Sequence, residues 1–157
     1  MKSLIKMKIY IDQSGKIEST NQPTIIAFSN GESGAVLISA KDKRAIQEYC
    51  KFFNRGRIFI YKTFACLIFI LIRNKLKQID QIIIDEEYKG HEAEIKHYLL
   101  QIIRKTSNDF PKDNIIFRQI GKKSNAHLLA YKVRKGKEKP NFIARENQLI
   151  PYLFRLK

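Results

Sequence analysis

The period of apolar and polar positions changes several times along the chain, which predicts a mixture of strands and helices. Short β-branched runs at residues 8–12, 24–29 and 35–39 are typical of strands. The sequence NGESG separates the second run from the third, and a glycine-containing turn of this length predicts a β-hairpin. Further strands are expected at residues 57–61, 81–85 and 114–120.

Helical spacing begins after the hairpin. The first helix is expected to start at Ser39, which with Asp42 forms a capping box, and to stop at the sequence NRG. Residues 63–77 are ambiguous by periodicity, and the length of this apolar run favours a helix. The clearest amphipathic pattern follows at residues 95–103, where apolar side chains recur three and four positions apart.

The C-terminal third is less regular. Residues 126–137 can form a return strand or a short helix, and the alternation of Leu129, Tyr131 and Val133 favours the strand. The remaining residues carry enough apolar side chains to pack back onto the domain. The elements together predict one α+β domain over residues 1–157, in which a small mixed or antiparallel sheet packs with about three helices.

The charge of the chain favours a polyanionic partner. Thirty lysine and arginine residues against fifteen acidic ones give a formal net charge of +15, and such an excess attracts nucleic acid or an anionic membrane surface. The most apolar segment, residues 64–72, is too short to span a bilayer, which needs about 20 residues. The N-terminus carries no sustained apolar region typical of a secretory signal. A soluble intracellular protein is therefore expected.

Acidic side chains are concentrated at one strand end. Six of the fifteen lie between Asp80 and Glu94, and Asp85, Glu86 and Glu87 are consecutive. The strand period places Asp85 and Glu87 on one face and Glu86 on the other. A helix N-terminus explains the later acids, Glu92 and Glu94, but it explains the three consecutive carboxylates less well. A functional role is therefore favoured for these three.

Carboxylates at such a position suit phosphodiester hydrolysis, in which a bound divalent cation stabilises charge on the phosphoryl oxygens and activates water. Glu87 and Lys89 resemble the E-x-K element of the PD-(D/E)xK nucleases. In that resemblance the lysine steadies the attacking water or the scissile phosphate, and Asp80 would be the upstream acid. Asp80 lies on the same strand, closer than that family places it, and Glu94 with Lys96 matches E-x-K equally well.

Asp12 closes the first predicted strand and resembles the first metal ligand of ribonuclease H-like enzymes. The matching late region of the chain offers Asn125 and His127 where those enzymes have an acid. An ordinary turn-forming role for Asp12, ahead of Gly15, is therefore the favoured interpretation.

The basic residues are densest between Lys122 and Arg145, where a single acid, Glu138, interrupts them. A hairpin of this composition suits contacts to phosphates, and Arg57 lies in a second basic turn. No recognition helix, zinc finger or RNA-recognition motif indicates base-specific readout. The expected nucleic-acid-binding residues are Arg57, Lys122, Lys123, Arg134, Lys135 and Lys137.

The sequence IIIDEEYKGHEAEIKHYLL, taken with the length and basic charge, resembles a family of small nucleases encoded by filamentous, lipothrixvirus-type viruses of hyperthermophilic archaea. The resemblance implies an α+β fold remotely like nucleotidyltransferases, activity on linear double-stranded DNA, and a location in the cytoplasm of an infected host cell. It also implies that Glu86 is the catalytic carboxylate.

The sequence therefore predicts a carboxylate-dependent DNA nuclease that is assisted by a divalent metal ion. Mg²⁺ is the expected ion. Glu86 and Asp85 are the expected metal ligands, and Asp85, Glu87 and Lys89 are the expected supporting residues. The alternative is a basic nucleic-acid-binding protein without enzymatic activity. Nucleotidyl transfer is a third class, and the chain lacks the P-loop that would grip a nucleoside triphosphate.

Overall fold

A computed structural model describes residues 7–154. Six strands form one mixed sheet in the order β5-β4-β1-β2-β3-β6. β2 is antiparallel to β1 and β3. β4 is parallel to β1, β5 is parallel to β4, and β6 is parallel to β3. The strands are β1 (Met7–Ser14), β2 (Thr24–Ser29), β3 (Ser33–Ile38), β4 (Ile79–Asp85), β5 (Ile115–Arg118) and β6 (Phe142–Ala144).

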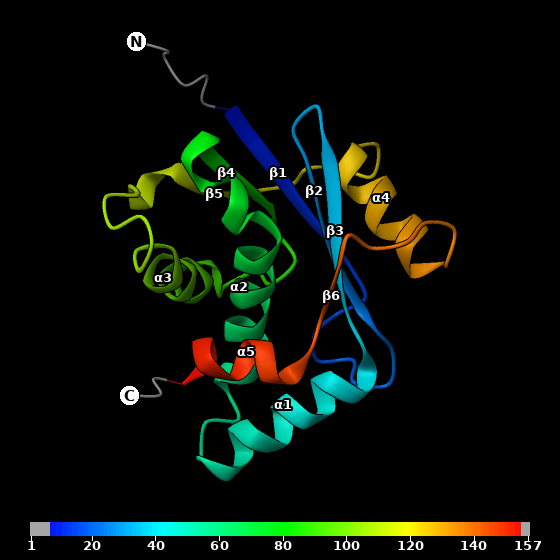
Figure 1. Ribbon diagram of the computed structural model, residues 1–157, viewed down its shortest axis with the longest axis vertical. Helices are drawn as coiled ribbons and strands as arrows, with labels where there is room; N and C mark the ends of the chain where they lie inside the picture. The colour runs from blue at the N-terminus through cyan, green and yellow to red at the C-terminus, as the bar shows by residue number, and fades with distance from the viewer. Residues whose placement is uncertain (1–6, 155–157) are drawn as a thin grey trace.

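Five α-helices cover the two faces of this sheet (Figure 1). α4 packs on β1, β2 and β3 from one side, and α2 packs on β2 and β3 from the other, where it also contacts α1, α3 and α5. The helices are α1 (Ala40–Phe52), α2 (Ile58–Ile72), α3 (Glu92–Ile103), α4 (Asn125–Arg134) and α5 (Glu146–Leu153), and short 3-10 helices span Arg73–Gln78 and Lys112–Asn114.

The strand period divides the core into two. On β1 and β2, alternate residues such as Ile11 and Ile26 join a large apolar core with α2 and α3. The intervening positions of β2 and β3 form a second core, in which Ala27 and Ala35 pack with Ala130 of α4. Because alternate side chains point to opposite faces, the two cores identify the face to which any strand residue points.

Several predicted elements are confirmed. The hairpin around NGESG is β2 and β3, and the predicted strands at residues 8–12, 81–85 and 114–120 lie within or overlap β1, β4 and β5. Ser39 caps α1, and its hydroxyl accepts a hydrogen bond from the Asp42 backbone amide at 3.0 Å. The C-terminal segment packs back as β6 and α5, with Leu149 and Leu153 buried.

The predicted strand at residues 57–61 is wrong, because this segment is the start of α2. Eleven of the fifteen residues of α2 are buried, so the helix is surrounded by protein and shows no polar face. A short window of such a helix cannot be distinguished from a buried strand by its apolar pattern. The two α-helices beyond the three expected are α4 and α5.

The strand favoured at residues 126–137 is also wrong, and α4 occupies this position. Ser124 caps the helix by accepting a hydrogen bond from the His127 backbone amide at 3.0 Å. Ala126, Ala130 and Val133 are buried at helical spacing, and small side chains there let the helix approach the sheet closely. Of the three side chains whose alternation favoured a strand, Val133 is buried, Leu129 is half-buried and Tyr131 is exposed, so they do not share one face of a strand. The basic hairpin predicted from Lys122 onward is consequently α4, a loop and β6.

A buried lysine fixes the loop that connects β1 to β2. Lys43 of α1 is fully buried, and its ammonium donates hydrogen bonds to the Lys16 and Ser19 carbonyls and to the Thr24 hydroxyl, at 3.1, 2.7 and 3.0 Å. Burial lowers the pKa of Lys43 to about 8. These bonds hold the loop that follows the acidic end of β1.

No helix among residues 7–154 is long and apolar enough to cross a membrane.

Candidate metal centre

Two aspartates lie side by side on adjacent parallel strands, Asp12 near the end of β1 and Asp85 at the end of β4. Ile11 of β1 is in register with Ile84 of β4, so the next residues, Asp12 and Asp85, lie side by side. Ile11 and Ile84 belong to the core shared with α2. Asp12 and Asp85 therefore point to the opposite face, which is the face on which α4 packs.

Glu87 joins these two aspartates. Its backbone amide donates to the Asp85 carbonyl at 2.9 Å, which turns the chain back at the strand end. Asp12, Asp85 and Glu87 each offer a carboxylate oxygen, and these three oxygens lie within 4.8 Å of one another. Mg²⁺ holds oxygen ligands at about 2.1 Å, so neighbouring ligands on one ion are roughly 3–4 Å apart. We call Asp12, Asp85 and Glu87 the carboxylate group.

A histidine of α4 contacts this group. The Nδ1 atom of His127, in the first turn of α4, lies 2.8 Å from Asp12 Oδ2. An ionised carboxylate can only accept a hydrogen bond, so beside ionised Asp12 the Nδ1 atom carries a proton, and in the neutral imidazole the free lone pair is then on Nε2. The His127 side chain is 35% exposed, and this nitrogen can therefore reach a ligand or a water molecule.

The carboxylate group is held by bonds to the backbone and by one buried tyrosine. Asp85 Oδ1 accepts from the Ile120 amide and Asp12 Oδ1 from the Gln13 amide, both at 2.8 Å. Tyr88 is buried, and its hydroxyl accepts from the Ile17 amide at 3.1 Å. These contacts fix Asp12 and Asp85 and tie the turn that carries Glu87 to the loop after β1.

The electrostatics of the carboxylate group favour a bound cation. Burial raises the pKa of Asp12, and the neighbouring charge of Asp85 raises it further against the hydrogen bond from Gln13. The pKa of Glu87 is raised to about 7 by burial and then by the charges of Asp12 and Asp85. A divalent ion among the three oxygens would reverse this repulsion, because it stabilises the ionised form of each carboxylate.

These raised pKa values predict how stability depends on pH in the presence of a chelator. Folded Glu87 holds its proton up to about pH 7, whereas its ordinary pKa is 4.5. The free energy of unfolding should therefore fall as the pH rises from about 4.5 to 7. Glu87→Gln should remove part of this fall and be more stable than the wild type at about pH 8, by about 1 kcal/mol once solvent screening of the half-buried side chain is allowed for.

Urea denaturation at several pH values, with a chelator present, measures this effect. Glu86→Gln is the matched control, since it removes the same charge from the adjacent position. Parallel stability profiles for Glu87→Gln and the wild type would contradict the assignment of the raised pKa to Glu87.

The structure separates the sequence-predicted site residues. Asp85 and Glu87 come together, but Glu87 lies beyond the end of β4 and reaches Asp85 through the turn, not through the strand alternation that was expected. Glu86 is half-buried but does not belong to the carboxylate group, and the geometry does not support it as a ligand beside Asp85. Lys89 is exposed in the following turn, and Asp80 is exposed near the start of β4 rather than beside the group.

The interpretation of Asp12 as a turn former is wrong. Asp12 lies inside β1, is in register with Ala27 of β2 and is only 3% exposed. The signals that could have identified it were its resemblance to the first ligand of ribonuclease H-like enzymes and the late position of His127. Those two residues are 115 positions apart in the chain and in hydrogen-bond contact in the fold.

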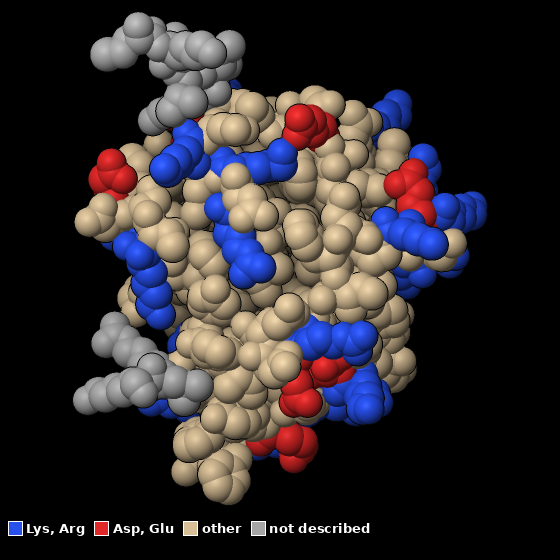
Figure 2. All heavy atoms as spheres, in the orientation of Figure 1, with Lys and Arg blue, Asp and Glu red and all other residues tan. Residues whose placement is uncertain are grey.

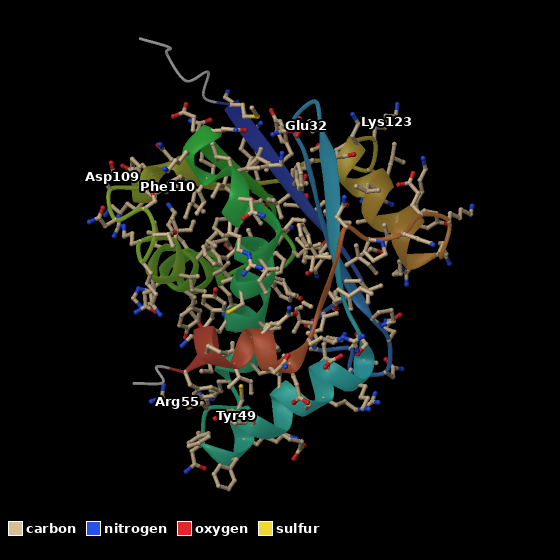
Figure 3. The ribbon with its side chains drawn as sticks, in the orientation of Figure 1. Glu32, Tyr49, Arg55, Asp109, Phe110 and Lys123 are labelled. Atoms are coloured by element: carbon tan, nitrogen blue, oxygen red, sulfur yellow. The ribbon has the colours of Figure 1, made fainter. Side chains whose placement is uncertain are left out.

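Basic side chains lie around α4, at the right of Figure 2. Lys122 and Lys123 are exposed in the turn before the helix, at the same end as His127, and Figure 3 labels Lys123 there. Arg134, Lys135 and Lys137 lie at the other end of α4. Arg57 does not join them, because it precedes α2 on the opposite side of the sheet.

One further cation was missed by the sequence analysis. Arg118 at the end of β5 is in register with Asp85, so both side chains point to the same face. Its guanidinium lies over the Tyr10 ring, 5.8 Å from the centroid. A phosphate bound near the carboxylate group would lie on the same face of the sheet as this exposed arginine.

Comparison of the chain with protein-family models, with curated proteins and with solved structures finds no match.

Proposed function

We propose that this chain is a metal-dependent nuclease that hydrolyses phosphodiester bonds of DNA at the carboxylate group. The observation that carries the proposal is the convergence of the Asp12, Asp85 and Glu87 oxygens within 4.8 Å, in a protein of net charge +15. Three carboxylates this close repel one another. Among residues 7–154 none of them forms an ion pair with a lysine or an arginine, although the chain is rich in both.

Mg²⁺ or Mn²⁺ held by these carboxylates would neutralise charge on the phosphoryl oxygens and lower the pKa of a bound water. His127 donates from Nδ1 to Asp12, which orients the ring and leaves Nε2 able to accept a proton. Lys122 and Lys123, exposed in the turn before α4, and Arg118, exposed at the end of β5, would contact the phosphates of a bound strand. The site assigned here replaces Glu86 with Asp12 and Glu87 as the principal carboxylates beside Asp85.

Linear duplex DNA labelled at one end tests the proposal. Cleavage should require Mg²⁺ or Mn²⁺ and stop on addition of a chelator. Closed circular duplex, single-stranded DNA and RNA, run in parallel, identify the preferred substrate and the need for an end. Salt-sensitive binding that no chelator alters, without cleavage under either ion, would reject the nuclease in favour of the non-enzymatic binding protein.

A further inference from the structure

A second concave site lies on the other side of the sheet. A cavity of about 700 Å³ opens between α1, α2, α3 and α5, the helices that cover the face opposite α4. Figure 3 labels Tyr49 and Arg55 at this end of the molecule, near α5. The cavity therefore shares no residue with the carboxylate group, and its role does not depend on the nuclease proposal.

The charged side chains that line this cavity are all of one sign. They are Arg55, Lys62, Arg104 and Lys105, with His97 beside them. No lining residue within 7–154 is acidic, and none of the four cations forms a salt bridge with a described residue. Four unpaired cations around one cavity form a favourable place for an anion.

Lys62 is half-buried, and the exposed Arg55, Arg104 and Lys105 line the same cavity. Burial lowers the pKa of Lys62, and the charges of Arg55 and Lys105 lower it further. The Lys62 ammonium lies over the Tyr98 ring at 5.4 Å from the centroid. Arg104 donates from Nε and Nη2 to the Phe110 carbonyl at 3.2 and 3.1 Å, which fixes its guanidinium at the rim.

Aromatic rings form another part of the wall. The centroid of Tyr49 lies 5.0 Å from that of Phe53 and 4.9 Å from that of Phe154, and Phe53 is 5.4 Å from Phe154. Phe53 is 47% exposed, although exposed aromatic side chains of this size are costly to leave in water. Such rings offer faces on which a planar base can stack.

We propose that this cavity binds a nucleotide, with its phosphate among Arg55, Lys62 and Lys105 and its base against the rings of Tyr49, Phe53 and Phe154. A site for phosphate alone would need only the clustered cations, whereas the adjacent aromatic wall adds a surface for a planar base. The nucleotide can be a free molecule or one unit of a single strand, and the two share the same chemistry at the cavity.

Isothermal titration calorimetry of the full chain, with a chelator present so that the carboxylate group holds no ion, tests the proposal. The titrants are ATP, a short single-stranded oligothymidylate and inorganic phosphate. ATP or the oligonucleotide should bind, and phosphate should bind at least about tenfold more weakly because it cannot stack. Tighter binding of the oligonucleotide identifies a strand as the source, and tighter binding of ATP identifies a free nucleotide.

Substitutions locate the binding. Arg55→Gln and Lys105→Gln should each weaken ATP binding about tenfold through loss of a charge-assisted hydrogen bond. Lys77→Gln, exposed in the 3-10 helix before β4, removes the same charge away from the cavity and should leave the affinity unchanged. Melting curves of each variant confirm that the fold is intact.

Three results would overturn the proposal: neither ATP nor oligonucleotide binding up to millimolar concentration, equal affinity for phosphate and ATP, or equal losses in Lys77→Gln and Arg55→Gln. Asp12→Asn should bind ATP as the wild type does. Loss of cleavage in that variant with ATP binding retained separates the two sites.

Discussion

Asp12→Asn is expected to reduce metal-dependent DNA cleavage by roughly a thousandfold or more, because a metal ion at a hydrolytic site contributes several kcal/mol to transition-state stabilisation. Asp12 contributes one of the three oxygens that lie within 4.8 Å and also positions His127. Asparagine keeps the size of the side chain and an oxygen that can accept from the Gln13 amide. The effect should therefore fall on activity and not on folding.

Glu86→Gln is the matched comparison, since it neutralises a neighbouring carboxylate outside the group. Its cleavage rate should stay within about threefold of the wild type. Initial rates on end-labelled linear duplex, measured at saturating Mg²⁺ with melting curves for both variants, compare them directly. If Glu86→Gln abolishes cleavage while Asp12→Asn does not, the site belongs to Glu86 and the carboxylate group has another role.

The metal itself gives a readout that does not need activity. Mn²⁺ should raise the melting temperature of the wild type at about pH 8, where Glu87 is ionised, because an ion that binds only the folded state stabilises it. Asp12→Asn should show a much smaller rise. Equal rises in both proteins would place the ion elsewhere.

Phe64→Ala is expected to lower the free energy of unfolding by about 4 kcal/mol. Phe64 is 1% exposed in the middle of α2, and its ring packs against Tyr88 with centroids 5.3 Å apart. Removing a buried phenyl ring loses its transfer free energy and leaves a cavity, which together cost about 3–5 kcal/mol. Because Tyr88 holds the turn that carries Glu87, the variant should also cleave DNA more slowly at temperatures where it remains folded.

Phe52→Ala provides the control, since the same side chain is 81% exposed at the end of α1. Its free energy of unfolding should change by less than about 0.5 kcal/mol. Urea denaturation followed by circular dichroism measures both variants. A loss below about 1 kcal/mol in Phe64→Ala would mean that α2 does not form the centre of the core described above.

The local pattern determined most of the elements. Residues 24–38 carry their own turn signal, and α1 begins at a serine whose hydroxyl accepts from Asp42, so interactions within a few residues define these segments. The length of the apolar run at residues 63–77 favoured a helix, which α2 confirms as far as Ile72. The pattern failed at the start of α2 and at α4, for different reasons. α2 is buried on all sides and has no polar face to reveal its period, whereas α4 packs small side chains on the sheet and leaves larger ones exposed.

What the sequence determined by itself was the basic charge, the α+β class and the presence of an acidic segment, with Asp85 and Glu87 in it, at the end of a strand. Only the tertiary structure decided which other residues join them. The parallel pairing of β1 with β4 brings Asp12 beside Asp85, and the packing of α4 on the sheet brings His127 to Asp12. Strand pairing and helix docking join residues that are far apart in sequence, so no local period or spacing specifies which side chains meet.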